Sequence, residues 1–219
     1  MLTIYGAFRS RASRNIWLCY EASIPFKLVP VVQSYRLKGA PPPAGALETQ
    51  SPEFLKINPH GHIPSIDDDG VILHESLAIN LYLAKKHGGP LGPANLAEDG
   101  EMTMWSMWAL CERAGVPAHV ADGGFEAMTL SVAMNGPKPE TLEALNGPFA
   151  QLDKALARTG WLVGGRFTVA DINVAEIVRY AAGTKALFDA NPNVKKWYDA
   201  CVGRPAYKKM WAEREAEPV

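Results

Sequence analysis

The sequence between residues 63 and 86 reads IPSIDDDGVILHESLAINLYLAKK, and this stretch decides the fold. Two short apolar segments, 63–66 and 71–73, flank the polar run DDDG, which is typical of a hairpin turn between two strands. The residues from Glu75 to Lys86 carry apolar side chains at helical spacing, which predicts a helix. A hairpin that runs directly into a helix indicates a mixed α/β unit.

The segments nearer the start of the chain predict a β-α-β arrangement. Residues 2–5 and 26–32 have the character of strands, and residues 13–21 carry an apolar stripe at helical spacing. The connection between the two strands is long enough for a parallel crossover. These elements therefore predict two parallel strands joined by a helix.

The middle of this half is irregular. Residues 33–50 include the run APPPAG, which can hold neither a helix nor an inner strand, so a surface loop is expected. Ser51, as an N-cap before Pro52, predicts a short helix that ends near Lys56. With the hairpin and the helix after it, residues 1–87 are predicted to form one α/β domain, βαβ-α-ββα, with a mixed sheet.

Residues 88–97 are predicted to be a linker, because the run GGPLGP interrupts every regular element. No segment after the linker has the character of a strand. Residues 98–219 are therefore predicted to form an all-helical bundle of about five helices. The expected helices cover residues 98–112, 140–158, 168–182 and 192–203, and the last begins at Pro205.

Composition narrows the class of protein. The chain has 219 residues, 47% of them apolar and 21% charged, with a net charge of -1. This balance is ordinary for a globular protein and provides no basic field for nucleic acid or acidic membranes. No apolar run approaches the roughly 20 residues that span a bilayer, and no signal peptide is recognised. Three cysteines far apart, without a CxxC pair, argue against disulfides or zinc, so a reducing cytoplasmic location is expected.

Ser10 is the first candidate for chemistry. It lies in the run RSRASR, residues 9–14, between the first predicted strand and the first predicted helix. Backbone N–H groups and the helix dipole favour an anion at such a junction. A serine hydroxyl there can donate to a bound thiolate, and each unit by which a thiol pKa falls corresponds to about 1.4 kcal/mol. The alternative interpretation is that Ser10 or Ser13 only caps the helix.

Two further pairs of residues suggest recognition of a peptide. If the Ile63-Pro64 bond is cis, the backbone of Ile63 can pair with a peptide-like ligand as a strand would. An ordinary trans bond is the alternative. Glu75 and Ser76 begin a predicted helix, where the serine and the helix N–H groups suit a carboxylate and the glutamate suits an amine. The alternative for this pair is an ordinary helix start.

These features together resemble the cytosolic glutathione S-transferase family. The run NPHGHIP (58–64) matches the family pattern NPxGxxP, and ESLAI (75–79) matches ESxAI. The run FTVADI (167–172) is similar to the family's capping-box and staple segment, and the spacing of Ser10 and Arg14 also agrees. The resemblance covers nearly the whole chain. It implies a thioredoxin-like N-terminal domain, an all-helical C-terminal domain, glutathione as co-substrate, no metal and a homodimer.

The resemblance also implies a role for each matching residue. Ile63 matches the residue whose backbone pairs with the cysteinyl part of glutathione, and Pro64 matches the cis-proline. Glu75 and Ser76 match the site for the γ-glutamyl group. His62 stands where a lysine or glutamine often contacts the glycine end.

Ser10 matches the serine that activates glutathione in the serine-type classes, with Ser13 as the second candidate. Tyr5 lies inside the first predicted strand, so a tyrosine-type mechanism fits poorly. No cysteine lies near Ser10, which argues against the cysteine-type classes. Asp171 is expected to be a folding residue and not a catalytic one.

A pocket for the second substrate is expected from the first helix of the second domain. Aromatic and sulfur-containing side chains gather there at helical spacing and would suit a flat, hydrophobic electrophile. A domain-interface core is the alternative interpretation of the same stripe. The candidate pocket residues are Met104, Trp105, Trp108 and Cys111, with Phe8 and Arg9 as neighbours of Ser10.

The function implied is that of a detoxifying glutathione transferase: a thiolate stabilised by serine attacks a hydrophobic electrophile or a peroxide. One rival is a glutathione-dependent isomerase, dehalogenase or ether-cleaving enzyme. The other is a catalytically weak binding or regulatory protein on the same fold. The expected partners are small molecules, with no nucleic acid and no membrane.

Overall fold

The computed structural model describes residues 1–112 and 124–217. Contacts within the chain divide it into two compact units. The first contains Met1–Gly89 together with the C-terminal segment from Pro205, and the second contains Pro90–Arg204. The predicted boundaries placed residues 98–219 in one domain, whereas here the last helix belongs to the first unit.

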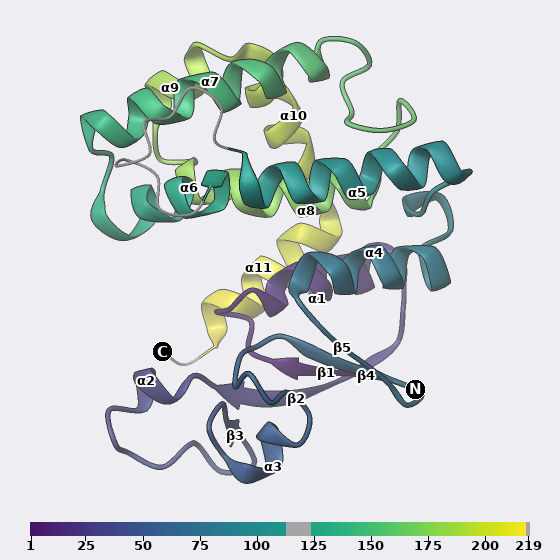
Figure 1. The fold of residues 1–219 in the computed structure, drawn as a ribbon, viewed down its shortest axis with the longest axis vertical. Helices are drawn as coiled ribbons and strands as arrows, with labels where there is room; N and C mark the ends of the chain where they lie inside the picture. Colours follow the sequence, from purple (N-terminus) through teal and green to yellow (C-terminus); the bar gives the residue numbers. More distant parts are fainter. Residues whose placement is uncertain (113–123, 218–219) are drawn as a thin grey trace. The chain divides into compact units, whose positions relative to one another are not determined.

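The first unit is built on a five-stranded mixed sheet with the strand order β3-β2-β1-β4-β5 (Figure 1). β1 pairs in parallel with β2 and antiparallel with β4, so the parallel crossover expected from the sequence is present. Leu2, Ile4 and Gly6 alternate with less buried residues, which places one face of β1 in the core. The strands are β1 (Leu2–Gly6), β2 (Phe26–Val32), β3 (Leu47–Glu48), β4 (Ser65–Asp68) and β5 (Val71–His74).

Three helices of the first unit lie side by side on one face of this sheet (Figure 1). α1 contacts both α4 and α11, and its residues 12–19 are all buried. The edge ring contact between Trp17 of α1 and Tyr207 of α11, 4.9 Å between centroids, holds the C-terminal helix on this unit. The helices are α1 (Ala12–Glu21), α2 (Ser34–Leu37), α3 (Pro52–Leu55), α4 (Ser76–His87) and α11 (Pro205–Ala216).

The structure differs from the sequence-based expectation at two places in this unit. The hairpin turn is shorter than predicted, because Asp68 pairs with Val71 and leaves only Asp69 and Gly70 between the strands. Both turn residues have positive φ, 54° and 91°, as a tight two-residue hairpin requires. The segment 33–50, expected to be a loop, contains α2 and the short edge strand β3.

The second unit is helical, and its core is α8. All ten residues of α8 are buried, and it contacts α5, α6 and α10. Two of the helices, α6 and α9, were not predicted from the sequence. The elements are α5 (Leu96–Cys111), α6 (Gly124–Asn135), α7 (Pro139–Leu156), α8 (Val169–Val178), the 3₁₀ turn η2 (Arg179–Ala181), α9 (Lys185–Asp189) and α10 (Pro192–Val202); η1 (Gly89–Leu91) leads into it. Among the residues described in either unit, none of the helices has the length and apolar character needed to cross a bilayer.

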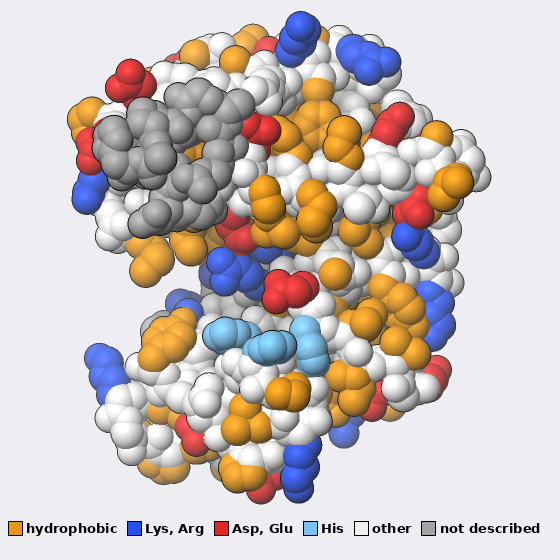
Figure 2. Space-filling model, viewed as in Figure 1, with side chains coloured by type: hydrophobic (Ala, Val, Ile, Leu, Met, Phe, Trp, Pro, Cys, Tyr) orange, Lys and Arg blue, Asp and Glu red, His pale blue; other side chains and the backbone are white. Residues whose placement is uncertain are grey.

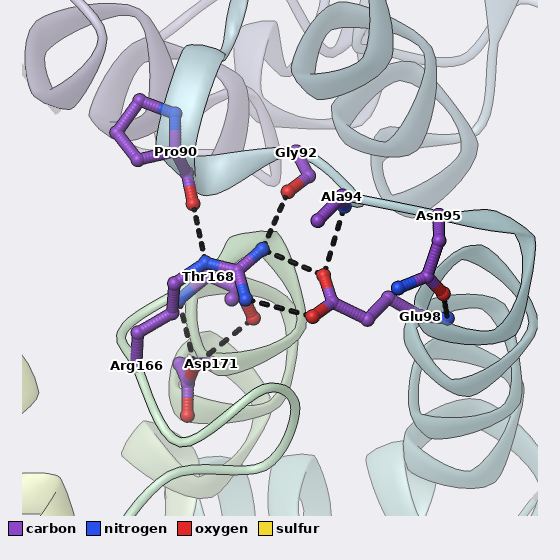
Figure 3. Close-up of polar contacts among 8 residues, drawn as sticks. All are labelled: Pro90, Gly92, Ala94, Asn95, Glu98, Arg166, Thr168 and Asp171. Carbon is purple, nitrogen blue, oxygen red and sulfur yellow. Dashed lines mark hydrogen bonds and ion pairs between the residues drawn. The ribbon is translucent and has the colours of Figure 1, made fainter.

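Arg166 fixes the start of the second unit (Figure 3). Its guanidinium donates to Pro90 O at 3.0 Å, to Gly92 O at 3.0 Å and to both carboxylate oxygens of Glu98 at 2.9 and 2.6 Å. Glu98 also accepts from the N–H of Ala94 at 2.9 Å. The segment entering α5 is therefore tied to the loop before α8. Hydrogen bonds from Arg166 and from Ala94 lower the pKa of the Glu98 carboxyl to about 2.

Acid is expected to weaken the ion pair between Arg166 and Glu98. Since the pKa of Glu98 is lowered on folding, its stabilising contribution is complete above its ordinary pKa of 4.5 and is lost as the pH falls toward about 2. Urea unfolding of the wild type and of Glu98→Gln, from about pH 6 to about pH 3, should show a stability difference that narrows in acid. Glu101→Gln, an exposed position on the same helix, is the control. A stability difference between the wild type and Glu98→Gln that stays constant with pH would contradict the lowered pKa of Glu98.

Candidate active site

Ser10 lies in the turn between β1 and α1. Its Oγ donates to Ala7 O at 2.6 Å and accepts from the N–H of Ala12 at 3.0 Å. The hydroxyl therefore satisfies a backbone N–H in the first turn of α1, as a cap would. Ser10 is also half-exposed, so it is not sealed in the core of the unit.

Ser13, the second candidate, lies in a different environment. It is 1% exposed and is part of the first turn of α1, where its N–H donates to Ser10 O at 3.3 Å. A ligand has no access to such a side chain while α1 stays folded. Accessibility therefore favours Ser10, and the choice between the two serines stays a prediction.

Gly6, at the end of β1, brings two predicted parts of the site together. The Ile63-Pro64 bond is cis. A Cβ on Gly6 would lie 3.9 Å from Cβ of Pro64 and 3.9 Å from Oγ of Ser10. The same Cβ would lie 2.6 Å from Cβ of Ala12, which leaves no room for any side chain. Glycine at this position thus allows the helix to approach the strand, with the Ser10 hydroxyl and the Pro64 ring beside it.

The loop before Pro64 is braced by a buried asparagine. Nδ2 of Asn58 donates to His62 O at 2.7 Å and to Oγ of Ser65 at 3.1 Å, and Oδ1 accepts from the N–H of His60 at 3.0 Å. One side chain therefore binds the backbone before Ile63 and the hydroxyl of Ser65 after it. The asparagine belongs to the NPHGHIP run, but its bracing role was not predicted, because the sequence does not show which loop atoms it reaches.

Glu75 and Ser76 lie at the start of α4. Glu75 is exposed and has φ 67°, a left-handed conformation that costs a residue with a side chain about 1–3 kcal/mol. Strain of this kind is concentrated at functional sites, which agrees with the predicted binding role. Ser76 is mostly buried, and its hydroxyl accepts from Nη1 of Arg14 at 3.1 Å.

Arg14 contributes a buried positive charge beneath this helix start. Its side chain is buried in α1, and the adjacent Asn15 donates to Ser76 O at 2.8 Å. A guanidinium beside the N-terminus of α4 adds to the helix dipole, so a carboxylate is favoured there. The link between α1 and α4 was not predicted, although the spacing of Arg14 from Ser10 was noted. The burial of an arginine side chain in α1 is the structural signal of this link.

Histidine side chains gather on the face of the first unit seen in Figure 2. The rings of His60 and His74 lie 6.4 Å apart, and Nδ1 of His74 lies 3.1 Å from Oγ of Ser65. Burial lowers the pKa of His74, and the nearby His60 adds to this effect, while Glu75 opposes it. His62 is exposed, and its predicted contact with a ligand stays a prediction.

The predicted pocket residues of α5 divide into two kinds. Met104 is 52% exposed and Cys111 is also exposed, whereas Trp105 and Trp108 are half-buried. The two tryptophan rings meet edge to face at 5.3 Å, and Trp108 contacts Phe125 of α6 at 4.9 Å. The tryptophans therefore pack within the helical unit. Whether any of the four contacts a substrate stays a prediction.

Phe8 and Arg9, the other two predicted pocket residues, form the middle of the turn that carries Ser10. Their backbone N–H groups donate to the Glu217 carboxylate, and the Arg9 guanidinium donates to carbonyls at the end of α11. The Arg9 charge therefore lies against the C-terminal helix. Glu217 was not predicted, since an acidic residue near the end of a chain resembles an ordinary solvated side chain.

Comparison with known proteins identifies the family. Residues 5–91 match the family described as Glutathione S-transferase, N-terminal domain, and residues 125–205 match Glutathione S-transferase, C-terminal domain. The chain therefore belongs to the glutathione S-transferase family. These matches confirm the predicted fold class, a thioredoxin-like domain followed by an all-helical one.

Individual relatives agree with this assignment. Glutathione S-transferase F13 of Arabidopsis thaliana is 29% identical over 95% of this chain and 94% of its own length. A probable glutathione S-transferase of Oryza sativa, GSTF1, is 30% identical over 76% of this chain and 80% of its own length. A solved theta-class enzyme from the citrus canker pathogen Xanthomonas axonopodis pv. citri, with glutathione bound, is 26% identical, with a TM-score of 0.71 and coverage of 95% and 96%.

Proposed function

We propose that this glutathione transferase binds glutathione along Ile63 and Pro64 and stabilises its thiolate with the hydroxyl of Ser10. The thiolate then attacks an electrophilic carbon of a hydrophobic second substrate, forms a C–S bond and displaces the leaving group. The half-exposed Ser10, whose hydroxyl lies near Gly6 at the end of β1 as the Pro64 ring does, carries this proposal. Its hydroxyl would donate to the cysteine sulfur of glutathione if the peptide backbone of the ligand paired with Ile63.

The chemistry of activation requires only a rotation of one hydroxyl. Ser10 Oγ now donates to Ala7 O, and the same hydrogen can turn toward a sulfur anion while Oγ continues to accept from Ala12 N–H. The helix start adds its dipole in the same direction. A charge-assisted hydrogen bond to the anion contributes about 1.5–3 kcal/mol, which lowers the thiol pKa by about one to two units.

We propose binding positions for the remaining parts of glutathione as well. The γ-glutamyl carboxylate suits the start of α4, near Ser76 and Arg14, and its ammonium suits the exposed carboxylate of Glu75. The exposed His62 suits the glycine carboxylate. The aromatic residues of α5 remain the predicted source of contacts to the electrophile, and the homodimer remains an expectation.

Binding and turnover together test the function. The purified protein should be retained on immobilised glutathione and should conjugate glutathione to an aryl halide. Retention without turnover on any electrophile would favour a binding protein on this fold. Retention with no aryl-halide conjugation, but with isomerisation, dehalogenation of an alkyl halide or cleavage of an ether, would favour the specialised enzyme. Failure to bind glutathione at all would overturn the proposal.

Removing the charge of Glu75 is expected to weaken glutathione binding about 10-fold, because an exposed carboxylate paired with an ammonium would be lost. Glu75→Gln is preferred to alanine for this test, since it keeps the side chain at a position with positive φ. Calorimetry with glutathione and with an analogue lacking the α-amino group measures the pairing. The variant should lose affinity only for the ligand that has the amine, and an equal loss for both ligands would remove Glu75 from the amine site.

A further inference from the structure

The turn that carries Ser10 is hydrogen-bonded to the residues at the C-terminal end of α11 and just beyond it. Ala7 to Ser10 form a four-residue turn, closed by Ser10 N–H donating to Ala7 O at 3.1 Å. The N–H groups of its two central residues are taken by one carboxylate. Phe8 N–H donates to Oε1 of Glu217 at 2.8 Å, and Arg9 N–H donates to Oε2 at 2.7 Å.

Side chains of the turn and of α11 also donate to each other's backbone carbonyls. Nε of Arg9 donates to Arg214 O at 3.1 Å, and Nη2 donates to Glu215 O at 3.3 Å. These carbonyls belong to the last turn of α11, where the helix dipole favours a cation. Arg214 in turn donates to Phe8 O. The turn and the helix end thus satisfy each other's backbone groups.

This arrangement acts on the Ser10 hydroxyl through the backbone. Ser10 Oγ bonds to Ala7 O, the first carbonyl of the same turn, so the hydroxyl moves with the turn. Hydrogen bonds to an ionised acceptor are about twice as strong as neutral ones, and a carboxylate that receives two adjacent N–H groups fixes their direction. Without Glu217, both groups would be solvated and the turn would be free to change its geometry.

We infer that Glu217 is a positioning residue, which holds the Ala7–Ser10 turn so that the Ser10 hydroxyl meets the sulfur of bound glutathione. This inference rests on the proposed function of Ser10. Displacement of a reacting group by about 1 Å can cost up to about 100-fold in rate, so a contact outside the substrate's reach can still control the chemistry.

The sign of the effect separates positioning from simple electrostatics. A carboxylate near a thiolate repels it, so loss of the Glu217 charge alone would make the thiol of bound glutathione more acidic. Loss of a well-placed Ser10 donor would make the same thiol less acidic. The two explanations predict opposite shifts of the pH profile.

The test compares Glu217→Ala and Glu217→Gln with Glu215→Ala. Glu215 contributes only its backbone carbonyl to the network, and its carboxylate accepts from Nε1 of Trp211 at 2.8 Å. The Glu215 variant therefore removes the same charge from the same helix end and leaves the turn contacts in place. Glu217→Gln keeps one acceptor oxygen for the two N–H groups.

Glu217→Ala should lower kcat/KM about 10-fold and move the thiol titration of bound glutathione to higher pH, with melting temperature and glutathione affinity nearly unchanged. Glu217→Gln should give a smaller shift in the same direction, and Glu215→Ala should give none. An unchanged titration, or a shift to lower pH, would overturn the inference. An equal rate loss in the Glu215 variant would do the same.

Repeating the Glu217 substitution in the Ser10→Ala variant distinguishes failure of the positioning role from failure of the proposed function. With Ser10→Ala already present, Glu217→Ala should no longer move the titration to higher pH, because the positioned group is gone. If Ser10→Ala alone leaves the titration unchanged, the role of Ser10 is wrong. If Ser10→Ala shifts it and Glu217→Ala does not, only the positioning role is wrong.

Discussion

Replacing Asp171 with alanine is expected to destabilise the protein by about 3–5 kcal/mol, because it removes the acceptor of a fully buried network. Oδ1 accepts from Leu162 N–H at 3.2 Å and from Nε1 of Trp197 at 2.8 Å. Oδ2 accepts from the N–H and the hydroxyl of Thr168 at 2.8 and 3.1 Å. Burial raises the pKa of the Asp171 carboxyl to about 6, and these four donors oppose that effect.

The network lies at the start of the core helix α8, so its loss would reach most of the second unit. Asp171 and Thr168 form the capping box of this helix, as the sequence predicted (Figure 3). Without the carboxylate, the indole of Trp197 and two backbone N–H groups would be buried with no acceptor, and each such group costs about 1–3 kcal/mol.

Urea unfolding measures the loss, with two comparison variants. Asp171→Asn keeps one acceptor oxygen and should fall between the wild type and the alanine variant. Asp189→Ala removes an exposed helical acid that pairs with Lys185 at the surface, and should cost less than about 1 kcal/mol. Similar losses for Asp171→Ala and Asp189→Ala would show that the buried network contributes little.

Replacing Ser10 with alanine is expected to slow conjugation about 10- to 100-fold and to raise the thiol pKa of bound glutathione. The expected factor corresponds to the loss of one charge-assisted hydrogen bond of about 1.5–3 kcal/mol. Spectroscopic titration of the thiolate and the pH dependence of kcat/KM both report it. Glutathione affinity at high pH, where the thiol is ionised in any case, should change much less.

Ser10 also bonds to the N–H of Ala12, so alanine removes a helix cap worth about 0.5–2 kcal/mol. Ser10→Thr keeps the hydroxyl and should retain much of the activity, which separates the cap from the chemistry. Ser13→Ala is the matched serine control and should leave the titration near that of the wild type. The reverse order of the two alanine variants would assign the thiol to Ser13.

The sequence predicted the parts of the fold that local patterns specify. The β-α-β start, the hairpin and the helix after it follow from apolar spacing and from turn residues, and each is present. β3 was missed because two residues carry no periodic signal, and its pairing with β2 depends on a contact distant in sequence. α6 was missed because its segment, GFEAMTLSVAMN, lacks a clear apolar stripe.

The candidate site was predictable where a motif specifies a backbone conformation. The NPHGHIP and ESLAI runs located Pro64, Glu75 and Ser76 by residue type and spacing. The residues that hold those groups in place were not predictable in the same way. Asn58, Arg14 and Glu217 act through contacts that only the folded chain brings together, and Glu217 lies about as far from Ser10 in sequence as the chain allows.

Because α11 belongs to the first unit, that unit is assembled from both ends of the chain. A nascent chain would release β1, α1 and the other N-terminal elements from the ribosome long before residues 205–217 exist. Until then, α1 would lack the helix that packs against Trp17, and the Ser10 turn would lack its carboxylate partner. The helical unit, continuous in sequence, can fold during that interval, so the turn that carries Ser10 is completed only after the helical unit has been synthesised.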